Sequence, residues 1–368
     1  MSARSETDAA VRSPRGGKVV LGDRLGSREN NFDLLRLLAA WAVLVSHSFS
    51  LVGHDEPLHQ LGTTLGNLGV LIFFAVSGLL IRRSWEYDPS PWDFWVKRAL
   101  RLLPALATVG LLTAFVLGPL VTSWSLSSYL ASAQTWLYPL RITLLFPFGA
   151  QLPGVFEDNL YAGAVNGPLW SLPLEVFAYL LLFLLGLAGL LARRSVVTVM
   201  ALAGLAWAAW WITWTSDAVG SGYVLAAFAL GAAAYSWRDR LVLSWPWAAT
   251  AFVACVLSGL GPDAVRVVVW TVAVTYLAYW FAYAVPRTAR WMTAWGDASY
   301  GVYIWAFPIQ QTFVQLLGPD TAPWVLILVC TPVVWLLAIA SWRLVERPAL
   351  RHKPARTGTA RGAGGGTP

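Results

Sequence analysis

Long apolar runs alternate with short polar or basic segments along almost the whole chain. Ten runs approach the roughly 20 residues that a helix needs to cross a bilayer, at about 32–53, 65–82, 99–121, 168–191, 196–214, 222–237, 243–260, 264–285, 298–317 and 323–345. This pattern predicts an all-α polytopic membrane protein with about ten transmembrane helices. Residues 31–350 form its membrane domain, and the polar residues 1–30 and 351–368 are expected to be disordered tails.

The positions of the basic residues indicate the orientation in the membrane. Numbering the spans places nearly all of the 26 Lys and Arg residues on one side and only Arg141 and Arg266 on the other. The positive-inside rule then makes both termini cytoplasmic, in a multi-pass protein of the plasma membrane with the lipid bilayer as its surroundings. Because the bases lie between apolar runs rather than on one soluble patch, nucleic acid is not an expected partner.

Three further features concern the rest of the chain. The two cysteines, Cys255 and Cys330, lie in separate apolar runs, so neither a disulfide nor a cysteine metal site is expected. No secretory signal peptide and no appended extracytoplasmic domain are expected. The outer segment 122–167 is interrupted by Ser, Gln, Pro and Arg141, which favours an interfacial or re-entrant segment over another full span.

The first predicted span carries two ionisable residues, Arg36 and His47. Such residues inside a membrane helix are costly and therefore indicate a functional site. Eleven residues separate them, which is about three helical turns and about 16 Å, so they share one helix face at different depths. Arg36 is expected near the cytoplasmic end and His47 in the outer half of the span.

Glu175 in the fourth span is a second candidate. If this span begins near Pro168, Glu175 lies roughly 10 Å below the outer surface, at nearly the depth of His47. An imidazole beside a carboxylate is suited to general-base chemistry, because its pKa lies near neutrality and a carboxylate can fix its tautomer. Each residue alone is as easily a structural hydrogen-bonding group; the shared depth favours function.

A cationic group stands at the start of the third span. Arg98 and Arg101 are three residues apart and so are neighbours on one helix face. Cytoplasmic topology and contact with lipid headgroups are the ordinary explanation for such a pair. An anionic cofactor held there would need an arm of roughly 15 Å to reach the layer of His47. Pantetheine has about that reach, which points to an acyl thioester of coenzyme A.

Six segments in order resemble the acyltransferase-3 family of integral membrane acyltransferases, over about residues 31–348. They are FDLLRLLAAWAVLVSH, GVLIFFAVSGLLIRR, KRALRLLPA, PLWSLPLEVFAY, DASYGVYIWAFPI and WRLVERP. The chain departs from the family at Ala306, where many members carry a histidine, so a mechanism with a second intramembrane histidine is not expected.

The resemblance implies a membrane O-acyltransferase that moves an acyl group, acetyl first, from cytoplasmic acyl-CoA to a hydroxyl acceptor. A glycan, a lipid-linked sugar or a small molecule would serve as acceptor, as in polysaccharide modification. The implied roles are catalysis for His47, Arg36 and Glu175, acyl-CoA binding for Arg98, Arg101, Ser77 and Gly78, and shaping of the substrate cavity for Trp170, Ser171, Tyr300 and Tyr303. No metal is implied, and the oligomeric state is left open.

Two alternatives remain from the residues themselves. A proton-coupled transporter or flippase could use His47 and Glu175 as a proton relay, although inverted repeats are not evident. A zinc site could form in SHSFSLVGHDEPLH, where His47 is followed by His54, Asp55, Glu56 and His59. However, His54 and His59 fall in a polar external loop, where solvated side chains are ordinary.

Overall fold

The computed structural model describes residues 18–27, 29–215, 221–287, 289–294 and 296–354. Two short strands pair antiparallel, β1 (Lys18–Val20) and β2 (Val242–Ser244). The helices are α1 Leu21–Arg24, α2 Phe32–Ser50, α3 Leu65–Tyr87, α4 Pro91–Leu112, α5 Gly118–Val121, α6 Leu126–Ala131, α7 Ala133–Thr143, α8 Ser171–Leu187, α9 Arg194–Thr215, α10 Ser221–Ser236, α11 Trp245–Ser258, α12 Asp263–Ala284, α13 Arg290–Thr293, α14 Ser299–Leu317, α15 Pro323–Ser341 and α16 Arg347–Leu350.

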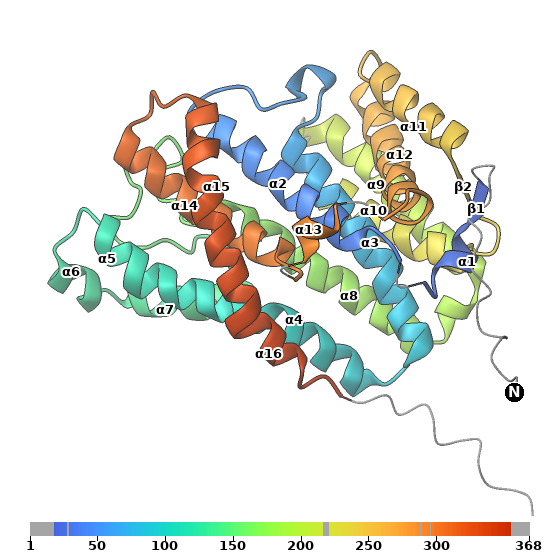
Figure 1. Cartoon of the computed structure of the whole chain (residues 1–368), viewed down its shortest axis with the longest axis horizontal. Coiled ribbons are helices and arrows are strands. Elements are labelled where there is room, and N and C mark those ends of the chain that lie inside the picture. The colour runs from blue at the N-terminus through green and yellow to red at the C-terminus, as the bar shows by residue number, and fades with distance from the viewer. Residues whose placement is uncertain (1–17, 28, 216–220, 288, 295, 355–368) are drawn as a thin grey trace, which may run out of the picture.

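Seven helical segments within the described residues are long and apolar enough to cross a membrane. They are Phe32–Ser50, Leu65–Tyr87, Pro91–Val121, Gly167–Leu187, Arg194–Thr215, Asp263–Ala284 and Pro323–Leu350. The chain is therefore an all-α polytopic membrane protein. The other three predicted spans coincide with α10, α11 and α14 (Figure 1). Since α10 and α11 have only 16 and 14 residues, the total of ten stays a prediction.

Two of the long helices change their winding near one end. A π-helical turn at Thr113–Leu117 joins α4 to α5, and another at Trp342–Glu346 joins α15 to α16. Such turns insert one extra residue and often occur at functional sites. The starts are more regular: the Thr64 side chain caps α3, and the Ser90 side chain caps α4.

Helices α2 and α3 run antiparallel in close contact, and glycines set their register. A Cβ on Gly69 would lie 2.5 Å from the Ala39 carbonyl oxygen, and one on Gly66 would lie 3.1 Å from the Ser46 Cβ. Small residues allow this approach between membrane helices. The outer end of α2 is therefore level with the start of α3.

The expectation that residues 1–30 form a disordered tail is wrong for the described part of that stretch. β1 pairs with β2, and α1 follows it directly. The side chain of Leu21 is 0% exposed and packs with Leu243, Tyr279 and Tyr283. Burial of these apolar groups explains why a polar stretch adopts structure here. Residues 1–17 and 355–368 of the predicted tails lie outside the described residues.

The outer segment 122–167 contains α6 and α7, of 6 and 11 residues. Neither is long enough to cross a bilayer. Helix α7 packs on the outer part of α4, where a Cβ on Gly110 would lie 3.0 Å from the Pro139 Cα. The loop that follows enters the protein: Phe156 is buried, and the Asn159 side chain donates to the Gln311 carbonyl of α14 at 3.0 Å.

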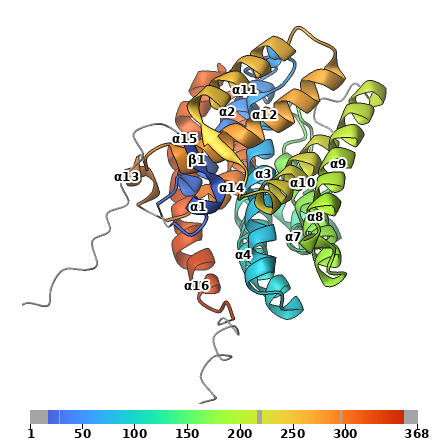
Figure 2. The same ribbon diagram turned by 90° about the vertical axis from the view of Figure 1, so that its right-hand side faces the viewer.

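Both described ends of the chain lie at one face. We call β1, α1 and the pairing of β1 with β2 the N-terminal clasp. Gly26, just after this clasp, and Pro354, after α16, line the same cavity. Figure 2 shows α16 and one end of α4 reaching this face together. By the predicted orientation it is the cytoplasmic face.

Candidate active site

Four charged residues from distant parts of the chain meet at the end of the helix bundle that the predicted orientation makes cytoplasmic. Arg36 of α2 donates from Nη1 to Asp297 Oδ2 at 2.9 Å, and Arg101 of α4 donates from Nη2 to the same oxygen at 2.7 Å. Arg101 Nη1 also lies 3.4 Å from Glu346 Oε2. Arg36 and Arg101, from the first and third predicted spans, thus share one carboxylate.

Asp297 stays ionised at this position. Burial raises the pKa of its carboxyl group, but Arg101 and Arg36 outweigh burial and hold that pKa well below its ordinary value. The Ser299 hydroxyl adds a hydrogen bond of 2.6 Å to Asp297 Oδ1. One carboxylate therefore joins α2, α4 and the start of α14.

Local backbone structure places these two acids. Gly296 has φ of +107°, and a Cβ there would lie 1.8 Å from the Trp342 indole nitrogen, so the turn into Asp297 requires glycine. Glu346 belongs to the π-helical turn Trp342–Glu346, and its Oε1 accepts from the Ser341 hydroxyl at 3.0 Å. Trp342 therefore packs against the turn that leads into Asp297, and it is also the first residue of the π-helical turn that carries Glu346.

Glu175 lies on α8 opposite α3. Its Oε1 accepts a hydrogen bond from the Ser77 hydroxyl at 2.7 Å and another from the Tyr179 hydroxyl, one helical turn along α8. A carboxylate with two hydroxyl donors is held in one orientation. Ser77 is thus at the predicted site, next to Glu175.

These groups surround a cavity of about 170 Å³ inside the bundle, which we call the membrane cavity. Its polar lining residues are Arg36, Ser77, Arg101, Ser171, Glu175, Tyr179, Tyr300 and Tyr303. The lining on α3 extends from Ile81 to Val70, which corresponds to about 16 Å along the helix. The cavity is therefore an elongated space that starts beside the arginines and runs outward.

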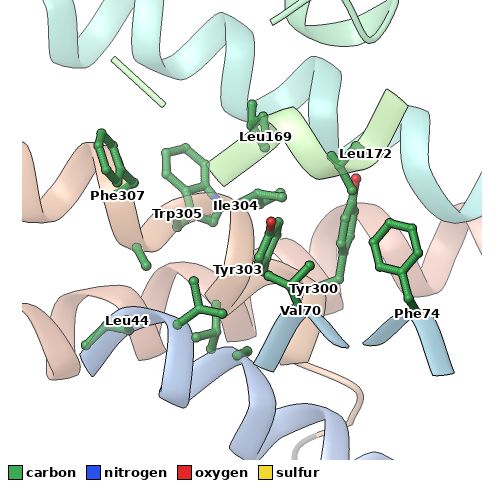
Figure 3. Packing of buried hydrophobic residues seen from close by; sticks show 14 of the residues in the cluster. Leu44, Val70, Phe74, Leu169, Leu172, Tyr300, Tyr303, Ile304, Trp305 and Phe307 are labelled. Carbon is green, nitrogen blue, oxygen red and sulfur yellow. The ribbon is translucent and has the colours of Figure 1, made fainter. Parts of the chain in front are cut away.

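The outer end of the membrane cavity is formed by α14 and the start of α8. The hydroxyls of Tyr303 and Ser171 are 2.7 Å apart, and the Tyr303 hydroxyl donates to the Pro168 carbonyl at 2.7 Å. Tyr300, one turn closer to the cytoplasm, donates to the Leu102 carbonyl at 3.2 Å. Figure 3 shows both tyrosine rings on α14 with Leu169 and Leu172 near their hydroxyl ends.

His47 lies farther out than this cavity and is not one of its lining residues. Its ring meets the Phe307 ring edge to face, with centroids 5.5 Å apart. An acid of the loop after α2, Glu56, is bound beside it, at the preceding residue of the helix. The neighbouring Ser46 hydroxyl donates to Glu56, and the Gly66 N–H donates to that hydroxyl at 2.8 Å.

The prediction that His47 and Glu175 share one layer is wrong. Phe307 touches both His47 and Gly167, since a Cβ on Gly167 would lie 3.2 Å from the Phe307 ring. His47 is therefore level with Gly167, and Glu175 lies eight residues, or about 12 Å, nearer the cytoplasm. The physical reason is the buried loop before Gly167, which lets the fourth span begin well inside the protein rather than at its surface.

Three other predicted site residues lie away from the membrane cavity. Arg98 is only 6% exposed; its guanidinium lies 3.6 Å from the centre of the Phe94 ring and donates to the Phe94 carbonyl at 2.6 Å. Gly78 lies about 100° around the helix from Ser77, as neighbouring helical residues do. It faces α10, where a Cβ on Gly78 would lie 2.0 Å from the Phe228 carbonyl oxygen. Trp170 lines a separate outer pocket.

That outer pocket has a volume of about 250 Å³ and lies among residues 147–151, 162–167 and Trp170. Adjacent residues of the turn Gly167–Ser171 line the two spaces, Trp170 the outer pocket and Ser171 the membrane cavity. The Asn166 amide donates to the Ile304 carbonyl at 2.9 Å and fixes this turn to α14.

Sequence reasoning missed Asp297, Glu346, Tyr179 and Glu56 as members of the site. The first two stand in the segments DASYGVYIWAFPI and WRLVERP, each beside the end of an apolar run. An acid at the cytoplasmic end of a span, matched to unpaired arginines on other spans, is the signal that could have identified them. Among the described residues, no group of three or more His, Cys, Asp or Glu side chains is arranged to hold a metal ion.

Comparison with known proteins accounts for this arrangement. The family model Acyl_transf_3, described as an acyltransferase domain, matches residues 29–343. The chain belongs to the acyltransferase-3 family. It is therefore an enzyme that transfers acyl groups other than aminoacyl groups, and the motif resemblance is confirmed.

Two relatives of this acyltransferase are similar over nearly their whole length. An O-acetyl transferase of Shigella phage Sf6 is 32% identical over 332 residues, which cover 87% of this chain and 96% of the relative. Nodulation protein 10 of Rhizobium leguminosarum bv. viciae is 28% identical over 359 residues, with 88% and 93% covered. No solved structure is significantly similar to the chain.

Proposed function

We propose that this acyltransferase moves an acyl group, acetyl first, from cytoplasmic acyl-CoA to a hydroxyl of a carbohydrate or related acceptor on the outer side of the plasma membrane. The observation that carries the proposal is the membrane cavity. It begins beside Arg36 and Arg101, runs outward along α3 for about 16 Å, and ends one helical turn short of the level of His47. A thioester on a pantetheine arm fits such a space.

Oxygen as the accepting atom is supported by the relative from Shigella phage Sf6, which is named an O-acetyl transferase. On the outer side, the pocket beside Trp170 offers an aromatic ring and amide groups, which suit a hydroxyl-rich acceptor. Acceptor and donor would then approach the turn Gly167–Ser171 from opposite sides.

The proposed reaction at His47 keeps atoms and charges balanced. The acceptor oxygen attacks the thioester carbonyl carbon while the imidazole takes the hydroxyl proton. The carbon–sulfur bond breaks, and the CoA sulfur leaves with the proton returned from the imidazolium. Glu56, bound at the neighbouring Ser46, would stabilise the imidazolium. In a second version His47 first receives the acyl group itself and then passes it to the acceptor oxygen.

The transport alternative loses the feature that favoured it. A proton relay between His47 and Glu175 requires direct contact or a bridging water, whereas their levels differ by about 12 Å. Glu175 instead accepts hydrogen bonds from Ser77 and Tyr179 within the membrane cavity. Through these two hydroxyl groups it would orient the acyl-CoA or polarise its thioester carbonyl.

The substitution His47→Ala tests the proposal. We expect acyl transfer to fall by at least about 100-fold, because general-base catalysis contributes that much or more. The assay follows ¹⁴C-acetyl-CoA added to inverted membrane vesicles and measures base-labile label in the cell-envelope fraction. The matched control is His54→Ala, since His54 is exposed in the loop after α2.

Transfer by His47→Ala within a few-fold of the wild type, at equal protein level, would overturn the role of His47. Label retained on the protein at His47 when acceptor is withheld would select the covalent version. Transfer from a donor added only to the outside of sealed, right-side-out vesicles would contradict the cytoplasmic direction.

A further inference from the structure

The two arginines nearest the membrane cavity are already occupied by acids. Asp297 binds both Arg36 and Arg101, and Glu346 binds Arg101 again. Arg98 is buried against Phe94. A polyanionic donor would therefore have to displace carboxylates in order to bind here. The cations available to a phosphate must be sought next to this cluster.

A larger hollow opens on the cytoplasmic face directly beside the membrane cavity. It has a volume of about 920 Å³, within the range of ligand sites. Leu80 of α3 lines both spaces, so they adjoin. We call it the basic pocket, because four cations line it: Arg83, Lys97, Arg287 and Lys353.

Positive charge in the basic pocket exceeds the negative charge. Its two acids are Asp33 and Asp88, and Asp88 is taken by an ion pair with Lys97. Among the described residues, Arg83, Arg287 and Lys353 form no ion pair. Positive charges lie close together around Lys353: burial and the nearby cations Arg101, Arg98 and Lys97 lower the pKa of its ammonium group.

The pocket also presents an aromatic surface. Tyr87 at its edge is 64% exposed, and the Arg83 guanidinium lies 5.4 Å from the centre of its ring. A purine can stack on an exposed tyrosine ring, and an arginine beside it can bind an adjoining phosphate. A cluster of cations that only fixed the membrane orientation or bound lipid headgroups would not require an exposed tyrosine ring at the edge of a pocket.

We propose that the basic pocket binds the adenosine 3′,5′-bisphosphate part of the acyl-CoA donor, with Arg83, Arg287 and Lys353 on its phosphates and Tyr87 under its purine. This inference rests on the proposed function and adds the site of the nucleotide. The pantetheine arm then passes Leu80 into the membrane cavity and carries the thioester outward. The anionic headgroup of a phospholipid shares the phosphate chemistry, but it has no purine for Tyr87 and no arm for the cavity.

The first experiment measures binding without catalysis. Adenosine 3′,5′-bisphosphate is titrated into the full-length protein in a neutral detergent, followed by calorimetry. We expect the triple variant Arg83→Ala/Arg287→Ala/Lys353→Ala to bind at least about 100-fold more weakly than the wild type, since removing each charge-assisted hydrogen bond weakens binding roughly tenfold. Arg351→Ala is the control, because Arg351 is an exposed cation on the same face outside the pocket.

Equal affinity of the triple variant and the wild type would overturn the proposal, and so would absence of binding to the wild type. Displacement of the probe by phosphatidylglycerol micelles, together with no preference for the 3′-phosphate over 5′-AMP, would identify a lipid-headgroup site instead. Neither readout requires transfer activity, so failure here is separate from failure of the acyltransfer direction.

The second experiment uses two donors with the same thioester. The triple variant should raise the KM for acetyl-CoA at least about tenfold, while kcat/KM for S-acetyl-N-acetylcysteamine, which has no nucleotide, stays at the wild-type value. Equal losses with both donors would show that the cations only maintain the fold, and would contradict the inference. If the wild type transfers from neither donor yet binds the bisphosphate through these cations, the proposed function fails while the nucleotide site stands.

Discussion

At the scale of single residues, the centre of the site is a shared carboxylate. Asp297 bonds to Arg36 and Arg101 through one oxygen and to Ser299 through the other. The two guanidinium groups would repel each other without it. A single acid therefore holds three helical elements together, and at the same time reduces the positive charge that the membrane cavity presents to a ligand.

Replacing this acid tests its structural role. Asp297→Asn should lower the free energy of unfolding by about 3 kcal/mol, because the partly buried Arg36 loses its ion-pair partner and Arg101 keeps only Glu346. The control Asp320→Asn, at an exposed outer position, should change it by less than about 0.5 kcal/mol. Thermal or denaturant unfolding in detergent gives both values, and equal stability of the two variants would contradict the prediction.

The pH dependence of that difference follows from the sign of the shift. The pKa of Asp297 is lower in the folded than in the unfolded protein, so its contribution is complete above the unfolded value near 3.9. The gap between wild type and Asp297→Asn should stay constant from about pH 5 upward. It should shrink as the pH falls below about 4.

At the scale of helices, glycines set the contacts that shape the site. Gly78 lies against the Phe228 carbonyl of α10, and across the same contact a Cβ on Gly231 would lie 2.4 Å from the Ala75 carbonyl oxygen. Because α3 is fixed to α10 on this side, the adjoining side, about 100° away, presents Ser77 to Glu175. Gly78 thus helps the site by its lack of a side chain rather than by touching the donor.

Gly78→Ala separates this role from cofactor binding. We expect a loss of stability of about 1–3 kcal/mol from overpacking between α3 and α10, with the KM for acyl-CoA of the folded fraction within about twofold of the wild type. Gly261→Ala is the control, since a Cβ there would meet its nearest atom at 3.4 Å. A raised KM with unchanged stability would restore the cofactor-binding assignment.

Much of the helix pattern could be predicted from the sequence, but the depth at which each helix starts could not. Apolar length predicts a span, and the distribution of basic residues placed Arg36 and the start of the third span, with Arg101, on the same side of the membrane. The predicted depth of Glu175 was wrong because the loop before Gly167 is buried, where Asn159 and Asn166 hold it by hydrogen bonds. In the sequence, polar loop residues that are hydrogen-bonded inside a membrane protein look the same as loop residues exposed to water. The depth of Glu175 therefore depends on tertiary contacts that the hydrophobic pattern does not encode.

At the scale of the whole molecule, the N-terminal clasp ties the start of the chain to the far side of the bundle. β1 pairs with β2, and the Leu21 N–H donates to the Leu241 carbonyl at 2.9 Å. Leu21 fills a small core with tyrosines of α12. This clasp encloses one edge of the basic pocket, to which Gly26 and Ser27 contribute.

Leu21→Ala tests the clasp. Emptying this buried position should cost about 2–4 kcal/mol of unfolding free energy. Lys18→Ala, at an exposed position on the neighbouring strand, should cost less than about 0.5 kcal/mol. Thermal unfolding of both variants in the same detergent is the measurement, and a stability of Leu21→Ala equal to that of Lys18→Ala would show that the clasp contributes nothing.

The turn Gly167–Ser171 has a consequence for the membrane itself. The membrane cavity reaches it from one side and the outer pocket from the other, and the hydroxyl and amide bonds to Tyr303 and Ile304 keep it closed. Two hollows that stop at one turn bring reactants near each other without a continuous aqueous path. In the proposed transfer of an acyl group across the membrane, this closed turn would limit ion conductance through the protein, so that the transmembrane voltage is preserved.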